Sequence, residues 1–361
     1  MKAFVDAKAF YDAMKKVSGA LHRSALPMLE QIRVDFEDGV CRLTASDITL
    51  WLIAEVPAEG DNFSFVFSNT ANAVRACQFF SGRMTAELRG EKKDMRVLLS
   101  AEGKTGEFPV NSVELWPECP CEPPKQHYIL DAPALLDRIK KVKYATRICE
   151  SKPALAGVRF DGKHVWCVDG YRLAVNDDDS LNVEQGFILP SNALTHLKAF
   201  DAGETELTVG AKYAVFAAEG IKLLIRRLVP SDNLQVETTV PQQSEETYPV
   251  NRKKLLEAIR YLDGCSRGMK APYVFFDGEA LFLRNGNSEY SVSLDVEGKC
   301  EIQYAFDLPY MKDALEQFAS EETIRISVIS KFAPIVIRGD SSNTALLLPV
   351  RMRNDWRWNA A

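Results

Sequence analysis

The sequence predicts an α+β fold of three similar domains, each with two helices packed on antiparallel sheets. Three observations predict it. An amphipathic helix pattern opens three segments of the chain, a hairpin signal follows each helix, and the helix patterns start 125 and 120 residues apart, at Phe10, Leu135 and Leu255. Each third of the chain therefore has the pattern of two helices and roughly eight short strands.

The first helix of each repeat is indicated by an aspartate or asparagine that precedes apolar residues at helical spacing. The matching sets are Asp6 with Phe10, Met14 and Val17; Asp131 with Leu135, Ile139 and Val142; and Asn251 with Leu255, Ile259 and Leu262. The short polar side chain can accept a hydrogen bond from the first free amides of a helix, and the spacing places the apolar residues on one face. We therefore expect three helices that start at equivalent points.

A hairpin signal follows each of these helices. Asp-Gly pairs stand between apolar, strand-like residues at Asp38-Gly39, Asp161-Gly162 and Asp277-Gly278. Glycine tolerates the positive φ that tight hairpin turns require, so each pair predicts a turn between two strands. A further strand, a polar cap and a shorter second helix are then expected around Ser68, Ser191 and Asp307.

The repeats set the expected domain boundaries. We place domain 1 at residues 1–123, domain 2 at 124–243 and domain 3 at 244–352, followed by a C-terminal extension at 353–361. The Pro-rich segment 117–124 and the polar segment 241–246 lack apolar periodicity. They are therefore the expected linkers between domains.

Composition limits the class of protein. The chain has 361 residues, of which 46% are hydrophobic and 26% charged, as in a globular protein with two or three domains. We find no window of 18 uninterrupted apolar residues, and the N-terminal segment meets Asp6 too early for a secretory signal, so we expect a cytoplasmic protein without a membrane segment. Eight scattered cysteines show no zinc-finger spacing, and we expect reduced thiols and no metal site.

The distribution of positive charge leaves two interpretations open. The net charge of −6 argues against a surface that binds nucleic acid everywhere. Yet Lys15, Lys140 and Arg260 occupy equivalent positions, opposite the apolar stripe of each first helix. They are either ordinary cations on solvated helices or, if the domains form an arc, a positive wall that contacts DNA phosphates.

Several motifs resemble those of the bacterial β sliding clamp, the β subunit of DNA polymerase III. In the first third, Leu26-Pro27-Met28-Leu29 is followed by Leu43-Thr44-Ala45-Ser46-Asp47. The most specific match is Lys152-Pro153-Ala154-Leu155-Ala156-Gly157-Val158 with Val168-Asp169-Gly170-Tyr171-Arg172-Leu173-Ala174. The segments 332–337 and 347–352 resemble the closing motifs of the family, so the match extends over residues 1–352.

The resemblance implies a function in DNA replication. A clamp of this family is a head-to-tail homodimeric ring with helices around the hole and sheets outside. It is a processivity factor that encircles double-stranded DNA without sequence specificity, is loaded by an ATP-driven clamp loader, and tethers DNA polymerase and other proteins that carry a short clamp-binding motif. The resemblance implies no catalytic residue and no cofactor.

The resemblance also carries over two sets of residues. The partner-peptide pocket comprises Leu155, Gly170, Tyr171, Arg172, Leu173, Pro230, Val236, Tyr310, Phe332, Pro334, Leu348, Pro349, Val350, Arg351 and Met352. There apolar side chains would receive the anchors of a peptide, and Arg172 would bond its backbone or an acid at the rim; alternatively, Leu173, Leu348 and Val350 are strand core residues. The DNA contacts are Arg23, Arg147 and Lys152, in addition to Lys15, Lys140 and Arg260.

Departures from the family pattern keep alternatives open. The stretches 263–265 and 103–105, where the family closes its ring, are short or polar, so a weak dimer is expected. The extension carries Trp356 and Trp358, which either fold onto the pocket or engage a partner, or belong to an unstructured tail. A clamp homologue, monomeric or virus-borne, that binds partners without encircling DNA is the main alternative. An enzyme acting on nucleic acid is disfavoured. Metal-dependent phosphoryl transfer needs carboxylates that converge on a cation, and the only dense acid run of this chain, Asp177-Asp178-Asp179, follows a strand in what looks like a solvated turn.

Overall fold

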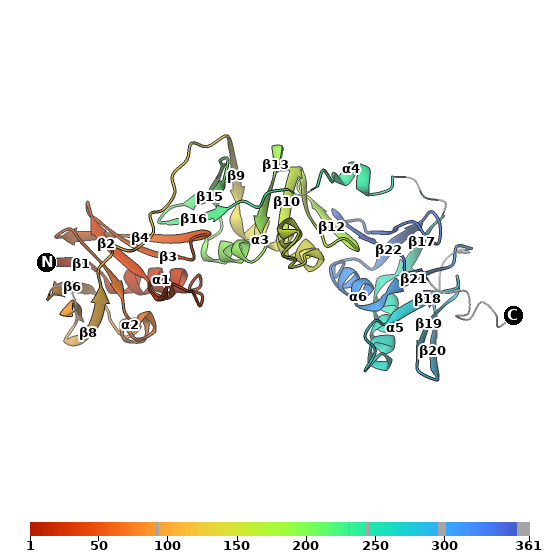
Figure 1. Ribbon diagram of the computed structural model, residues 1–361, viewed down its shortest axis with the longest axis horizontal. Helices are drawn as coiled ribbons and strands as arrows, with labels where there is room; N and C mark the ends of the chain where they lie inside the picture. Colours follow the sequence, from red (N-terminus) through yellow and green to blue (C-terminus); the bar gives the residue numbers. More distant parts are fainter. Residues whose placement is uncertain (91–93, 231, 243, 245, 295–300, 352–361) are drawn as a thin grey trace. The chain divides into compact units, whose positions relative to one another are not determined.

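The computed structural model describes residues 1–90, 94–230, 232–242, 244, 246–294 and 301–351 (Figure 1). Across these residues, the order strand, helix, strands, helix, strands occurs three times, with eight strands each time. The predicted α+β fold with antiparallel sheets is therefore confirmed. No helix in the described ranges has the length and apolar character needed to cross a membrane.

The elements of the three repeats have the following bounds. The first repeat contains β1 (Lys2–Asp6), α1 (Ala7–Ser18), β2 (Arg33–Glu37), β3 (Val40–Ser46), β4 (Leu50–Gly60), β5 (Phe63–Phe67), α2 (Thr70–Cys77), β6 (Arg83–Arg89), β7 (Arg96–Ala101) and β8 (Lys104–Asn111). The second contains β9 (Gln126–Asp131), α3 (Ala132–Val142), β10 (Gly157–Gly162), β11 (His164–Val168), β12 (Arg172–Asp177), β13 (Val183–Pro190), β14 (Glu204–Val209), β15 (Tyr213–Ala218) and β16 (Ile221–Arg226). The short helix α4 (Val236–Thr239) precedes the third, which contains β17 (Glu246–Asn251), α5 (Arg252–Cys265), β18 (Tyr273–Phe276), β19 (Ala280–Asn285), β20 (Ser288–Ser293), β21 (Tyr304–Asp307), α6 (Leu308–Glu316), β22 (Thr323–Val328), β23 (Ile335–Arg338) and β24 (Asn343–Leu347).

The three predicted helix caps are confirmed. Asp6 accepts a hydrogen bond from the Ala9 amide at 2.8 Å. Asp131 accepts one from the Ala134 amide at 2.7 Å, and Asn251 accepts one from the Lys254 amide at 3.0 Å. Each cap satisfies an amide that has no partner inside its helix, which fixes where α1, α3 and α5 begin.

The three predicted hairpins form, but their turns differ. Asp38 and Gly39 both have positive φ, 50° and 80°, and connect paired Glu37 and Val40, as expected for a two-residue turn. In the second repeat the register moves the turn one residue on, to Gly162 and Lys163. In the third, Asp277 instead accepts hydrogen bonds from the Glu279 and Ala280 amides, which makes a wider turn.

The expected second helix of the middle repeat is corrected. Residues Ala193–Ala199 form a 3-10 helix instead of an α-helix, whereas α2 and α6 form as predicted. Asn192, which precedes the 3-10 helix, already has helical backbone angles and makes no capping hydrogen bond with its side chain. Asn69 and Asp307 do cap α2 and α6, so the difference lies in the local start signal.

The chain forms two compact units, and each contains part of the middle repeat. The first unit is Met1–Leu136 with Asn192–Arg227, and the second is Asp137–Ser191 with Leu228–Ala361. The first holds a twelve-stranded sheet in the order β1-β6-β7-β8-β5-β2-β3-β4-β16-β15-β14-β9. The second holds an eight-stranded sheet, β13-β10-β11-β12-β24-β23-β22-β17, and a four-stranded sheet, β20-β19-β18-β21. The domain boundaries at 123 and 243 remain predictions.

Strand pairs join consecutive repeats within each unit. Strand β4 pairs with β16, with Trp51 opposite Leu224, and β12 pairs with β24, with Leu173 opposite Leu346. Both are pairs between the fourth strand of one repeat and the eighth strand of the next. We call them the first and second junctions.

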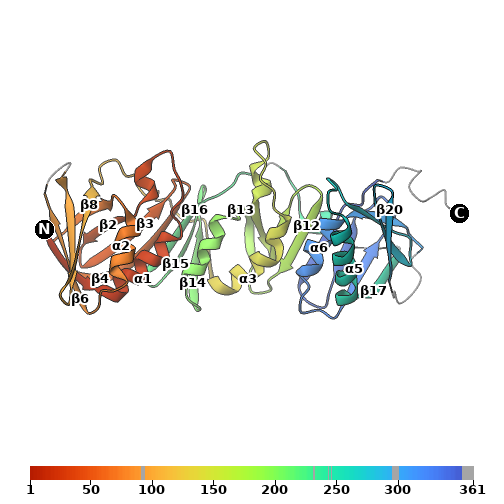
Figure 2. The same cartoon turned by 90° about the horizontal axis from the view of Figure 1, so that it is seen from below.

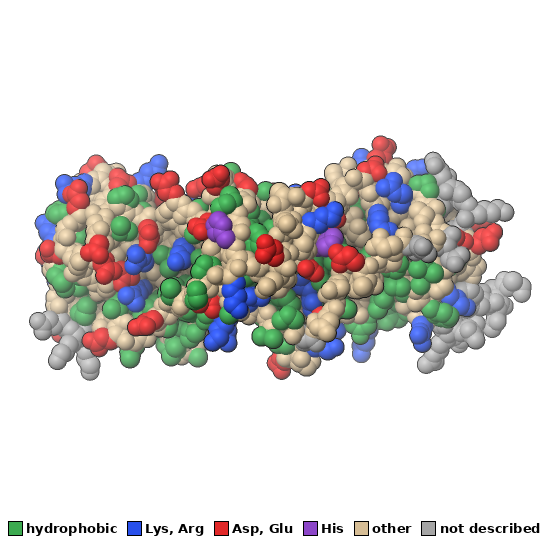
Figure 3. All heavy atoms as spheres, turned by 90° about the horizontal axis from the view of Figure 1, so that it is seen from above, with side chains coloured by type: hydrophobic (Ala, Val, Ile, Leu, Met, Phe, Trp, Pro, Cys, Tyr) green, Lys and Arg blue, Asp and Glu red, His purple; other side chains and the backbone are tan. Residues whose placement is uncertain are grey.

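Helices and sheets form layers inside each unit. In Figure 2, α1 and α2 lie side by side in front of the strands of the first unit, and α5 and α6 do so in the second. On the face seen in Figure 3, acidic and basic side chains are interspersed. The net negative charge of the chain is therefore not segregated onto that face.

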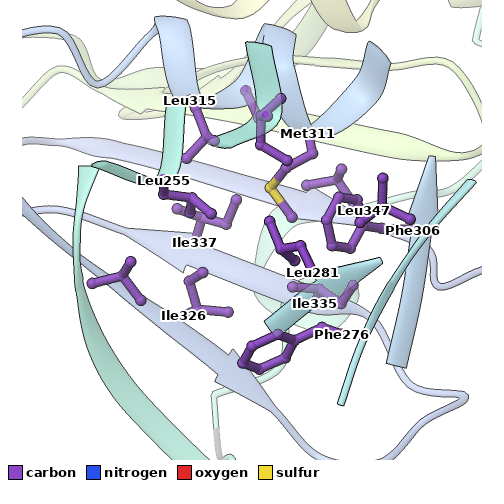
Figure 4. Packing of buried hydrophobic residues seen from close by; sticks show 14 of the residues in the cluster. Leu255, Phe276, Leu281, Phe306, Met311, Leu315, Ile326, Ile335, Ile337 and Leu347 are labelled. Atoms are coloured by element: carbon purple, nitrogen blue, oxygen red, sulfur yellow. The ribbon is translucent and has the colours of Figure 1, made fainter. Parts of the chain in front are cut away.

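A large apolar core of the second unit lies between α5, α6 and two sheets (Figure 4). The apolar stripe predicted for α5 is buried there, because Leu255, Ile259 and Leu262 are each at most 2% exposed. Leu281 of β19 and Leu347 of β24 pack into the same cluster. The helical periodicity therefore identified the buried face of α5 correctly.

Candidate functional site

The described residues of the predicted partner pocket all lie in the second unit, where some are buried. Leu155, Leu173 and Val236 belong to one apolar cluster at the second junction, together with Leu346 and Val336. Leu173 is only 1% exposed. These side chains form an apolar floor, as the core alternative for Leu173 anticipated.

Other predicted residues form an exposed surface above this floor. Tyr171, Phe332 and Leu348 are 53%, 60% and 43% exposed. The Leu348 amide donates a 2.8 Å hydrogen bond to the Tyr171 carbonyl oxygen, which fixes the end of β24 beside the β11–β12 turn. The Tyr171 ring lies 6.4 Å from that of half-buried Tyr310. We call these four residues the aromatic surface; large apolar side chains left exposed together are typical of a binding surface.

The turn before β12 is held by a buried aspartate. The Asp169 carboxylate accepts hydrogen bonds from the amides of Tyr171 and Arg172, at 2.9 and 3.0 Å. Gly170, between Asp169 and Tyr171, has a φ of +94°, which residues other than glycine rarely adopt. This geometry leaves Tyr171 exposed and turns Arg172 inward.

Arg172 connects the turn to α6 and to the 3-10 turn 143–145 that follows α3. Its guanidinium pairs with Asp169 at 2.9 Å and Asp313 at 2.6 Å and donates to the Tyr144 carbonyl oxygen at 2.6 Å. It also lies over the Tyr310 ring, 4.3 Å from the centroid. With its side chain 11% exposed and each guanidinium nitrogen engaged, Arg172 is held where it positions Tyr171 and Tyr310.

Burial affects the ionisation of groups around Arg172. Burial raises the pKa values of the Tyr310 and Tyr144 phenols and of the Asp307 carboxyl. For Arg172, burial acts to lower the pKa, but its hydrogen bond with Asp313 and the charge of Asp169 outweigh it and raise the pKa. Arg172 therefore keeps its charge, and both tyrosines remain neutral donors at neutral pH.

The other pocket residues are spread around this surface. Pro230 is exposed and lines a separate cavity with Arg159 and Asp232. Val350 packs on Phe275 and Phe282. Arg351 lies 5.7 Å from the Phe332 ring, while Pro334 and Pro349 are half-buried. Met352 and the extension 353–361 lie outside the described residues.

Sequence reasoning missed three residues of this site. Asp169 stands inside the motif that carries the family resemblance, so its place beside Tyr171 was a usable signal. Tyr144 and Asp313 had no local signal, because Asp313 is 141 positions from Arg172 in the chain. Only the fold brings the 3-10 turn 143–145 and α6 to the same guanidinium.

The predicted DNA-contacting cations differ in their surroundings. Lys15, Arg23 and Lys152 are exposed, and none forms an ion pair within the described ranges. Lys140 pairs with Asp137 at 2.8 Å, and Arg260 pairs with Glu316 at 3.3 Å. Both pairs are exposed, so each stabilises the chain by about 1 kcal/mol at most and can exchange for a phosphate.

Arg147 lies beside the aromatic surface. Its guanidinium is 5.9 Å from the Tyr171 ring centroid, and its amide donates to the Leu155 carbonyl oxygen. The loop 146–152 therefore places Arg147 at Tyr171, while exposed Lys152 stands at the start of the next turn.

The acid run that an enzyme would need is already paired. Asp177 contacts His164 at 2.6 Å, and Asp178 pairs with Arg138 at 2.8 Å. Among the described residues, no three or more His, Cys, Asp or Glu side chains lie together as metal ligands would. The run Asp177-Asp178-Asp179 therefore gives no support to a metal-dependent enzyme.

Removing the Arg172 side chain is expected to destabilise the second unit. An Arg172→Ala variant should lose roughly 3 kcal/mol in chemical unfolding, because Asp169 keeps a buried charge without its partner. Arg325→Ala is the matched control, since Arg325 also pairs with an aspartate but is 52% exposed. That control should lose at most about 1 kcal/mol. Equal losses in both variants would contradict a positioning role for Arg172.

Comparison with known proteins supports the resemblance seen in the motifs. No protein-family model matches the chain. A beta sliding clamp of Bacillus subtilis is 25% identical over an alignment of 376 positions. The alignment covers 94% of this chain and 96% of that protein. A beta sliding clamp of Staphylococcus aureus is 23% identical over 94% of this chain and 95% of its own length.

Solved structures share the fold. A DNA polymerase sliding clamp from Bacillus subtilis superposes with a TM-score of 0.84 and 18% identity, over 98% of this chain and all of that one. A DNA polymerase III beta subunit from Eubacterium rectale gives a TM-score of 0.86 and 16% identity with the same coverage. The motif resemblance is thus confirmed over almost the whole chain, which has the sliding-clamp fold and is similar in sequence to bacterial β sliding clamps.

Proposed function

We propose that the chain is a DNA sliding clamp, a processivity factor that encircles duplex DNA and tethers polymerases. The observation that carries this proposal is the threefold strand–helix repeat, matched over 98% of the chain by sliding clamps of known structure. Topological linkage to DNA does not require tight phosphate binding. A net charge of −6 is therefore compatible with this function.

Ring closure follows from the rule that joins the repeats. The fourth strand of the first repeat pairs with the eighth of the second, and the fourth of the second pairs with the eighth of the third. The third repeat's fourth strand, β20, pairs only with β19 in the described chain, and residues 104–108 of β8 pair only with β7. We infer that β20 of one copy pairs with β8 of a second copy, and two such contacts close a head-to-tail dimer.

The register of this seam can be derived from the first junction. Ile53 lies opposite Lys222 there, and the equivalent positions in the seam are Ser291 and Thr105. Glu289 then lies opposite Glu107. Glu107 already pairs with Arg96 of its own sheet at 3.3 Å, which reduces the repulsion between the two glutamates. The seam should still be weaker than the junctions within the chain, because it lacks their apolar pairs Trp51–Leu224 and Leu173–Leu346.

A cysteine pair tests the seam. Directly opposite antiparallel residues have Cα atoms about 4.5–5.5 Å apart, which suits a disulfide. A Thr105→Cys, Ser291→Cys double variant should therefore form a covalently closed dimer after mild oxidation, and once assembled on nicked circular DNA it should survive washing with high salt. Each single variant is the control for native cysteines. A species that sediments as a monomer and forms no cross-linked dimer would favour the alternative homologue that binds partners without encircling DNA.

The proposed DNA contacts are Lys15, Lys140 and Arg260 on equivalent helices, with Arg23 and Lys152 in loops. All five are exposed, as phosphate contacts require. Lys15, Arg23 and Lys152 have no competing ion pair among the described residues, so they should contribute more than Lys140 and Arg260. Arg147 is retained as a contact on the motif alone, because its side chain lies at Tyr171.

Glutamine at Lys15, Lys140 and Arg260 together should weaken the salt dependence of DNA binding. Each phosphate contact that is lost should reduce the slope of log K against log salt by about one. The control replaces three exposed strand arginines, Arg83, Arg89 and Arg325, with glutamine, and removes the same charge. Fluorescence titration of duplex DNA at several salt concentrations measures both slopes. Identical slopes for the two triple variants would remove the helix cations from the DNA-binding face.

The aromatic surface is the proposed attachment point for polymerases and other partners. Tyr171, Phe332 and Leu348 offer exposed apolar side chains above a packed floor, which is the arrangement that receives the anchors of a short peptide. Arg147 and Arg351 stand at Tyr171 and Phe332. They can bond peptide carbonyls or acidic side chains at the edge.

Substitutions on the aromatic surface should lower peptide affinity, whereas substitutions beneath it should lower the stability of the fold. Serine at Phe332 and Leu348 should weaken binding of a labelled polymerase peptide at least about tenfold, because the apolar contacts between these side chains and the peptide are lost. The melting temperature should change little, because both side chains are exposed. Leu173→Ala, beneath the surface, should instead cost about 2–5 kcal/mol of stability because it opens a cavity. Fluorescence anisotropy and thermal unfolding measure the two effects. Full affinity in the Phe332, Leu348 double variant would disprove this attachment point.

A further inference from the structure

A cavity of about 510 Å³ lies in the first unit, between the first junction and the linker that connects β8 to β9. Its floor includes Trp51 of β4 and Leu224 of β16, and Val215 and Tyr213 of β15 form one wall. Linker residues 116–122 cover it, and Figure 1 shows this linker passing beside β15 and β16. The volume falls within the roughly 300–1,000 Å³ typical of ligand sites.

The second junction shows what ordinarily fills this position. Trp51, Leu224 and Val215 occupy the places that Leu173, Leu346 and Val336 hold there, as the strand registers show. At the second junction the linker contributes Val236 of α4 and Val240, which directly follows α4, and both are buried on that apolar floor. The fold therefore covers an equivalent floor with two apolar side chains carried on a short polypeptide segment.

The linker of the first junction supplies no such side chains. The apolar cluster at Trp51 includes Ile53, Leu224, Tyr213 and Val215 but no residue of the linker. Trp116 instead packs with Leu29 and Val66 in another cluster. The linker is held at its far end by Glu122, whose carboxylate accepts hydrogen bonds from the Lys212 and Tyr213 amides at 2.9 and 2.7 Å. It therefore spans the floor without filling it.

Charges of both signs stand beside the apolar floor. Lys222, Arg42 and Arg33 line the cavity from the sheet with the carboxylates of Asp35 and Glu55, and Glu118 and Glu122 line it from the linker. Arg33 pairs with Asp35 at 2.8 Å, and Glu122 is engaged by backbone amides.

Burial raises the pKa of the Cys119 thiol in the linker, and the charges of Lys222 and Arg42 act to lower it. The two cations are therefore close enough to influence a group on the linker side of the cavity. Arg42 is paired with Glu55 at 2.8 Å, whereas Lys222 forms no ion pair within the described residues. Lys222 is therefore available to a carboxylate.

We propose that this cavity is a second peptide-binding site, which takes a short segment bearing apolar side chains next to a carboxylate. The apolar side chains take the place that Val236 and Val240 fill at the other junction, and the carboxylate pairs with Lys222. The site lies in the first unit, apart from every residue of the aromatic surface. A partner carrying two different motifs would thereby bind the same chain at two places.

The test uses the full chain with ¹⁵N-labelled tryptophan and the probe N-acetyl-Leu-Phe, which has two apolar side chains and a free carboxylate. The indole N–H signals of Trp51 and Trp116, assigned with Trp→Phe variants, report on the cavity, and that of Trp166 reports on the second junction. We expect saturable shifts of the Trp51 and Trp116 signals. The C-terminal amide of the same probe should bind about tenfold more weakly, the effect of one lost charge-assisted hydrogen bond.

Two variants and a control separate the contributions. Lys222→Gln should remove the difference between acid and amide, and Val215→Phe should block both probes by filling the cavity. Lys198→Gln, an exposed lysine of the same unit that does not line the cavity, should change neither. Unshifted Trp51 and Trp116 signals, shifts confined to Trp166, or equal affinity for acid and amide would each overturn the inference. Shifts confined to Trp166 would do so while leaving the proposed clamp function intact.

Discussion

The pairing of the fourth strand of one repeat with the eighth strand of the next is the constraint on which the rest of this structure depends. It makes one sheet out of two repeats at β4 and β16 and again at β12 and β24. It sets Trp51 against Leu224 and Leu173 against Leu346, and so creates the floor of the aromatic surface and the floor of the cavity. Because each pair takes strands from two repeats, the middle repeat is divided between the two compact units.

Local features of the fold could be predicted from the sequence because the residues involved are neighbours in the chain. Asp6, Asp131 and Asn251 were identified as caps because a cap bonds an amide three positions ahead. The apolar stripe of α5 followed from helical periodicity. The turn at Gly162 and Lys163 moved by one residue because the register of β10 with β11, and not the Asp-Gly pair, determines it.

The candidate site was predictable in membership but not in the role of each side chain. The motif resemblance placed Tyr171, Arg172 and Leu173 together, yet Tyr171 lies in the turn before β12, where strand alternation does not apply, so only the fold shows which side chain is exposed. Tyr171 is exposed, Leu173 is buried, and Arg172 is bound to Asp313 from α6. No sequence pattern predicts the ion pair between Arg172 and Asp313, which are 141 positions apart, so the positioning role of Arg172 could not be derived from the sequence.

The strands assigned to the seam differ in chemistry from those inside the chain. Each internal junction is sealed on one face by large apolar side chains, Trp51 with Leu224 and Leu173 with Leu346, whereas the seam would set Glu289 against Glu107. A closed ring whose interfaces differ in strength opens at the weakest interface. In the proposed ring, strain would therefore be released between copies, while the sheets inside each copy stay whole.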